Sequence, residues 1–154
     1  MRKLAAATLA LGLALPATGH EDTVPDIADP VSLRMVSMKQ VGAGMKALGD
    51  MAKGEAAFSV PLAAMSLRAM LAAASGYGEL FPEGTGIEDD HHTTAAPAVW
   101  EDRAGFEAEL AEFVAKLHAR VEQPPMAQAE LGAVMGEIGA SCRSCHESYR
   151  VKRN

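Results

Sequence analysis

A short motif near the C-terminus carries most of the chemical information in this 154-residue chain. Residues Cys142 to His146 read C-x-x-C-H, the pattern that attaches a c-type haem. On a helix, Cys142, Cys145 and His146 are spaced i, i+3 and i+4 and therefore share one face. Two thiols there can form thioethers with the vinyl groups of a porphyrin, and the imidazole can ligate its iron. The sequence thus predicts one covalent haem c per chain, held by its only two cysteines.

Two other uses of these cysteines fit the sequence less well. A disulfide or a thioredoxin-like redox pair belongs at the start of a helix in a βαβ unit, where the helix N-terminus lowers a thiol pKa. Here both cysteines come late in an expected helix, and no strand is predicted before it. A zinc site would lack its fourth ligand, because this face offers two thiolates and one imidazole. We therefore favour haem attachment.

The N-terminus has the pattern of a secretory signal. The positive start, Met1-Arg2-Lys3, precedes an apolar run from Leu4 to Leu15 and small residues up to Gly19. The apolar run is too short for a transmembrane helix, although an uncleaved anchor is the alternative interpretation. We expect cleavage after Gly19, export to the periplasm, and no membrane span in the processed protein. The predicted division is a signal peptide over 1–19 and a single domain over 20–154.

The charge of the chain narrows the class of partner. The formal net charge is −6, and removal of Arg2 and Lys3 with the signal would make it −8. An acidic protein is a poor match for nucleic acid or an anionic membrane, which both require clustered positive charge. The charge is consistent with a soluble protein that meets basic patches on redox partners.

Hydrophobic periodicity predicts an all-α protein. Aromatic residues make up only 5% of the chain, and four segments repeat apolar residues every three or four positions. Asp29-Pro30 resembles a helix start and Lys53-Gly54 a helix stop. The expected helices run from Pro30 to about Ala52, from Ser59 to about Ala74, from about Ala98 to Gln123, and from Leu131 to Tyr149. One long and two short connections predict an antiparallel, up-down-up-down four-helix bundle, with the haem in its core near the C-terminal end.

Four histidines lie outside the haem motif, and the first, His20, begins the short polar lead-in after the predicted signal. His91 and His92 follow Asp89 and Asp90 in a glycine- and proline-rich connection over 76–97. This cluster could bind a metal, but we favour solvated side chains in an exposed loop. His118 lies beside the apolar stripe of the third expected helix, and we expect it at the surface.

Several segments together resemble the cytochrome c′ family and its low-spin relatives. The C-terminal C-x-x-C-H-x-x-Y-R, from Cys142 to Arg150, carries the resemblance most clearly. It extends over essentially all of 29–154 through three further segments: Leu33 to Glu55, Leu80 to Gly84, and Pro97 to Trp100. The resemblance implies that Cys142 and Cys145 form the thioethers and that His146 is the proximal iron ligand.

The resemblance also implies roles for residues outside the motif. Arg34 would pair with a haem propionate, a role suited to a guanidinium, and the alternative is a solvated surface arginine. Arg150 lies one turn past His146 and would either contact the haem periphery or small anionic ligands, or complement the helix dipole. The other cofactor-binding residues that it implies are Met35, Thr85 and Gly86.

Met38 aligns with the distal residue of the family. In the low-spin relatives a methionine there completes the coordination, whereas in cytochromes c′ an apolar side chain only shields the iron. The run from Lys53 to Phe58 resembles the low-spin members more closely, so we favour Met38 as sixth ligand and electron carriage between redox partner proteins as the function. The alternative is a five-coordinate haem that binds nitric oxide or carbon monoxide. We expect no enzymatic activity, because the distal helix offers methionine and valine instead of a proton-transferring group. The resemblance further implies a homodimer through the first two helices.

Overall fold

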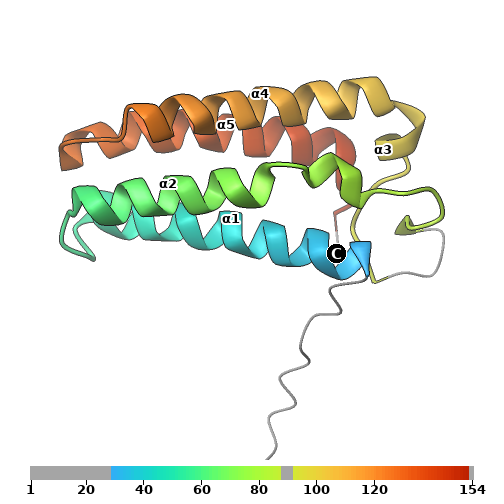
Figure 1. The fold of residues 1–154 in the computed structure, drawn as a ribbon, viewed down its shortest axis with the longest axis horizontal. Coiled ribbons are helices and arrows are strands. Elements are labelled where there is room, and N and C mark those ends of the chain that lie inside the picture. Colours follow the sequence, from blue (N-terminus) through green and yellow to red (C-terminus); the bar gives the residue numbers. More distant parts are fainter. Residues whose placement is uncertain (1–28, 88–91, 153–154) are drawn as a thin grey trace, which may run out of the picture.

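The computed structural model describes residues 29–87 and 92–152, so the predicted signal peptide lies outside the described residues. Four long helices run antiparallel along one axis, each packed against its neighbours in the bundle (Figure 1). The predicted all-α four-helix bundle is confirmed. No helix in the described ranges is both long and apolar enough to span a membrane. The long helices are α1 (Pro30–Lys53), α2 (Val60–Ala74), α4 (Arg103–Glu122) and α5 (Leu131–Tyr149).

Local side-chain chemistry sets the ends of the first two helices. The Asp29 carboxylate accepts hydrogen bonds from the backbone N–H groups of Val31 (3.1 Å) and Ser32 (2.9 Å), which have no partner within the helix. Gly54 ends α1 with φ of 77°, a left-handed conformation that glycine adopts without a steric cost. Ser59 caps α2 through its hydroxyl, which accepts from Leu62 N–H. The predicted bounds of both helices are confirmed within one or two residues.

The prediction of one continuous third helix is wrong. A short helix, α3 (Ala98–Glu101), stops at Asp102, where the backbone leaves helical geometry (φ −120°, ψ 57°), and α4 begins at the next residue. The Asp102 carboxylate accepts from Gly105 N–H (3.2 Å) and from the Tyr149 hydroxyl (2.8 Å). A Cβ atom on Gly105 would lie 2.2 Å from that carboxylate, so only glycine permits this approach. The break therefore depends on a side chain from α5.

Contacts with the C-terminal segment hold the end of the long connection against the bundle. The connection begins with the 3-10 turn η1 (Tyr77–Leu80), and a second such turn, η3 (Gln128–Glu130), precedes α5. Near its end, Ala96 N–H donates to Tyr149 C=O (3.0 Å) and Val151 N–H donates to Thr94 C=O (2.9 Å). These bonds form a single antiparallel bridge that holds the end of α5 against the connection.

Two groups of buried side chains stabilise the bundle. The helical core lies between the four long helices, and its fully buried members include Leu48, Met51, Leu67, Met70, Leu117, Leu131 and Ile138. The aromatic cluster lies beside α3 and consists of Phe81, Ala95, Val99, Phe106 and Tyr149. Its rings meet edge to face, with centroids 4.9 Å apart for Phe81 and Phe106 and 5.3 Å apart for Phe106 and Tyr149.

Candidate haem site

The α5 face that carries the motif opens into a cavity of about 520 Å³. Cys142, Cys145 and His146 all line it, as their i, i+3, i+4 spacing predicts. Both cysteines are half-buried and carry free thiols, and His146 is exposed. The volume lies within the usual range for cofactor and ligand sites, and most of its lining is apolar.

The environment of the motif favours neutral donor groups. Burial raises the pKa of the Cys142 thiol and raises that of Cys145 to about 11. Burial lowers the pKa of His146, and the neighbouring positive charge of Arg150 lowers it further. At neutral pH the imidazole is therefore uncharged, which is the form that binds a metal through a ring nitrogen.

Helix α1 supplies another wall of the same cavity. Met38 is half-buried, packs against the helical core and lines the cavity, whereas Met35 lines it with 42% of its surface exposed. Gly42 lies one turn beyond Met38, and a Cβ atom there would meet nothing within 4 Å. The α1 residues described in this wall include no histidine and no carboxylate; they are Arg34, Met35, Met38, Lys39, Val41, Gly42 and Met45.

Arg34 is 3% exposed, which excludes a solvated surface arginine. Its Nη1 donates to Leu80 C=O (3.3 Å) and Thr85 Oγ1 (3.1 Å). Its Nη2 donates to Thr93 Oγ1 (2.8 Å) and to Thr85 C=O. The guanidinium also lies 4.7 Å from the centre of the Phe81 ring. Arg34 thus ties α1 to the long connection.

The Nε of Arg34 could donate a hydrogen bond to a ligand. This nitrogen is buried and has no hydrogen-bond partner among the described residues, and the side chain lines the cavity. Burial lowers the pKa of this guanidinium, and the charge of Asp29 offsets that effect only in part, so its positive charge is costly to bury. A haem propionate would supply both the acceptor and the negative charge. The thiols, the imidazole and this orphaned donor therefore fit haem c.

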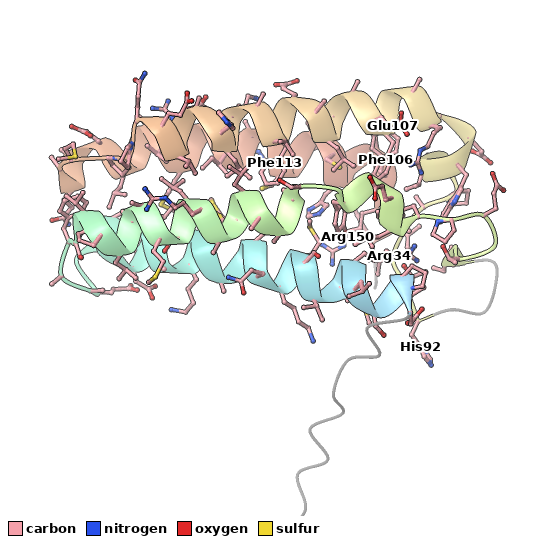
Figure 2. The ribbon with its side chains drawn as sticks, in the orientation of Figure 1. Arg34, His92, Phe106, Glu107, Phe113 and Arg150 are labelled. Carbon is pink, nitrogen blue, oxygen red and sulfur yellow. The ribbon has the colours of Figure 1, made fainter. Side chains whose placement is uncertain are left out.

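The other sequence-predicted residues lie at different distances from the cavity. Thr85 holds Arg34 in place and donates its hydroxyl hydrogen to Pro82 C=O (2.8 Å), and Gly86 is buried. Neither residue is among those that line the cavity, so their direct contact with haem stays a prediction. Arg150, Arg34 and His92 lie at the end of the bundle that carries α3 (Figure 2). Arg150 lines the cavity, and its Nε donates to Thr94 Oγ1 (3.3 Å).

The remaining histidines have no metal-binding partners in the described part of the chain. His92 is exposed at the edge of the cavity, and His91 lies outside the described residues. No group of three or more histidine, cysteine or acidic side chains within the described ranges is placed to hold a metal ion. His118 is at the surface as predicted, 3.7 Å from Glu122.

Part of the apolar lining has no clear sequence signal. Phe106 and Phe113 belong to the apolar stripe of the third expected helix, and both also line the cavity. Tyr77 lines it from η1, where burial raises the pKa of its hydroxyl. The sequence does not predict that Tyr77 faces the cavity, because a single aromatic residue between two glycines has no periodicity that would assign it to a buried face.

Comparison with known proteins extends the likeness over nearly the whole chain. A family model described as Cytochrome C′ matches residues 29–150. Cytochrome c′ of Cereibacter sphaeroides is 33% identical over 155 residues, covering 99% of this chain and all of that protein. Cytochrome c-556 of Agrobacterium fabrum is 32% identical over 126 residues, covering 82% of this chain and 84% of that protein.

A solved structure supports the same relationship. The structure of oxidized R. palustris cytochrome c556 superposes with a TM-score of 0.74 at 29% identity, covering 82% of this chain and 99% of that one. The shared bundle places the motif helix and the cavity within the matched region. With a family match that includes both cysteines and His146, this chain belongs to the cytochrome c′ family and is a monohaem c-type cytochrome that binds haem c covalently.

Proposed function

We propose that this protein carries single electrons between redox proteins in the periplasm and is not an enzyme. Bound haem supplies an iron centre that changes its charge by one electron. Cys142 and Cys145 hold the group through thioethers, and His146 ligates the iron from α5. Export through a signal peptide over residues 1–19 fits this role, since c-type haem is attached outside the cytoplasm.

We further propose that Met38 is the sixth iron ligand. The observation that carries this assignment is the composition of the α1 wall, whose described residues offer thioethers but no imidazole or carboxylate. Met38 is four positions after Arg34, on the same helical face, and is half-buried against the helical core. Met/His ligation is the arrangement of electron-transfer cytochromes and raises the reduction potential.

The remaining residues orient the group and exclude water. Arg34 would bind a propionate through Nε while its other nitrogens hold Leu80, Thr85 and Thr93. Buried rings of Phe81 and Phe106 lower the local dielectric, which favours the iron state of lower charge. The α1 wall has no proton donor of the kind that peroxide chemistry requires, which supports electron carriage over catalysis.

A second candidate function is the binding of nitric oxide or carbon monoxide. The 33% identity to a cytochrome c′ supports it, because an apolar distal side chain in that family shields the iron without binding it. In this case Met38 would shield the iron without binding it.

Optical spectra of the ferrous protein, with and without carbon monoxide, separate these functions. We expect sharp visible bands that the gas does not change, as in six-coordinate low-spin haem. Met38→Ala should give broad high-spin bands that shift when the gas is added. Met65→Ala is the control, because Met65 is exposed on α2 and does not line the cavity, so its spectrum should match the wild type. Broad wild-type bands that respond to the gas would contradict the ligand assignment and favour gas binding.

A homodimer through the first two helices stays a prediction. The space beside Gly44 is filled by Met70 of the same chain, since a Cβ atom on Gly44 would lie 2.4 Å from Met70 Cγ. This glycine therefore serves the packing of α1 on α2, and a dimer would need other contacts.

A further inference from the structure

Among the described residues that line the cavity, the exposed charges are positive, although the chain as a whole is acidic. Six of the residues that line the cavity are exposed, and we call them the rim: Met35, Lys39, Gly42, His92, His146 and Arg150. None of these six has a carboxylate, and Lys39 and Arg150 are permanent cations, although the chain carries a net charge of −6. Figure 2 shows His92 and Arg150 at one end of the bundle.

The other charged residues of the cavity contribute less to its surface. Glu109 is the one carboxylate among the described lining residues; it is half-buried and accepts a hydrogen bond from the Ser144 hydroxyl (2.7 Å). Arg34 is buried, so it does not add to the rim. Among the described lining residues, the exposed charged side chains are therefore Lys39 and Arg150.

Two exposed apolar side chains lie near Lys39 on the same helix. Met35 and its neighbour Val36 are 42% and 40% exposed, and both lie one turn of α1 from Lys39. A small apolar patch with charges at its edge is the common form of a transient interface, and redox complexes are at the small end of the size range.

Because salt screens distant charges, the charges of the rim affect partner binding more than the net charge of the chain does. At about 0.15 M salt the Debye length is about 8 Å, so acidic groups on distant surfaces are largely screened from a bound partner. Charges within the contact area act at short range and steer association.

We propose that the rim is the docking surface for a redox protein with an acidic surface around its own redox centre. This inference rests on the proposed electron-carrying function, and it replaces the basic partner that the net charge alone suggests. Lys39 and Arg150 would face carboxylates of the partner, and Met35 and Val36 would add apolar contacts.

Charged redox reagents can test the rim without an identified partner. The holoprotein is reduced and then oxidised either by hexacyanoferrate(III), an anion, or by tris(phenanthroline)cobalt(III), a cation; one electron passes to the reagent in each case. Salt is raised from about 0.1 M to about 1 M, which shortens the Debye length from about 10 Å to about 3 Å and keeps distant acidic groups screened throughout. We expect the rate with the anion to fall and the rate with the cation to rise.

Paired lysine variants assign the effect to the rim. Lys39→Gln should lower the low-salt rate with hexacyanoferrate(III) about three-fold, as expected for one charge lost near a trivalent reagent. Lys53→Gln is the control; it removes the same charge from the same helix, about 21 Å along the axis at the usual rise per residue. Its rate should stay near that of the wild type.

Two results would overturn the proposal: salt effects of the opposite sign, as the net charge predicts, or equal rates for the two lysine variants. The carbon monoxide spectra are read separately on the same preparations. A five-coordinate spectrum would therefore reject the Met38 assignment while the salt effects still report on the rim.

Discussion

The two ends of the bundle are stabilised in different ways. At the end away from the cavity, the helical core is closed by apolar side chains from all four long helices, and Leu48, Leu67 and Ile138 are fully buried. At the end with α3, a short helix, a long connection and the C-terminal segment surround the cavity (Figure 1). Apolar side chains of the protein itself fill the interior at the first end, whereas the second end surrounds the haem cavity.

The haem end combines the aromatic cluster with directional contacts. Arg34 holds the connection through four hydrogen bonds, and Tyr149 holds the joint between α3 and α4. Buried polar contacts of this kind are costly when one partner is lost. The comparison indicates that the haem end depends on its cofactor, whereas the other end is stable through its own packing.

The largest effect is expected from removing the covalent attachment. The double variant Cys142→Ser/Cys145→Ser should lose all haem staining on a denaturing gel, because no thioether can form. Amide hydrogen exchange should accelerate in residues 94–106 and 149–152, where the contacts surround the cavity. Exchange around Leu67 should change least, and equal loss of protection at both ends would contradict the comparison.

A core truncation should weaken the closed end strongly. Leu67 has no exposed surface, so Leu67→Ala should lower the free energy of unfolding by about 2–5 kcal/mol in denaturant titrations. Leu62→Ala is the matched control on the same helix; Leu62 is 36% exposed, and its loss should cost far less. The haem spectrum of folded Leu67→Ala should match the wild type, since Leu67 does not line the cavity.

Two glycines should respond to alanine in opposite directions. Gly44→Ala should cost about 1–3 kcal/mol of unfolding free energy, because the new methyl group would overlap Met70. Gly136→Ala should stabilise α5 by up to about 1 kcal/mol, since its Cβ would meet nothing within 4 Å. Thermal or denaturant unfolding of both variants measures this difference, and a stabilising Gly44→Ala would show that Met70 moves aside easily.

The smallest effect concerns the joint at Asp102 and depends on pH. The hydrogen bond to Asp102 raises the pKa of Tyr149 to about 12, above the value of about 10 for a free tyrosine. The stability that this bond provides should be present below about pH 10 and decline as the pH rises towards 12. Tyr149→Phe should melt below the wild type at pH 8, and the gap should narrow above pH 10. A gap that does not change with pH would mean that the ring, not the hydroxyl, stabilises the joint.

Much of the bundle was predictable because local chemistry determines it. Asp29, Gly54 and Ser59 set helix ends through groups within a few residues, and helical periodicity follows from side chains on the same segment. The same holds for the motif, because Cys142, Cys145 and His146 share a face on any α-helix. These features required no knowledge of distant residues.

The tertiary structure decided what depends on residues far apart in the chain. The break at Asp102 could be suspected from an acidic residue typical of helix caps, but the Tyr149 hydroxyl that holds it comes from 47 positions away. Arg34 is buried because three segments of the connection surround it, between 46 and 59 positions along the chain. The sequence by itself thus determined the helices and the haem-binding face, since short-range hydrogen bonds and periodicity encode them. Only the tertiary structure decided the cavity walls, the free Nε of Arg34 and the cationic rim, because these arise where distant segments meet.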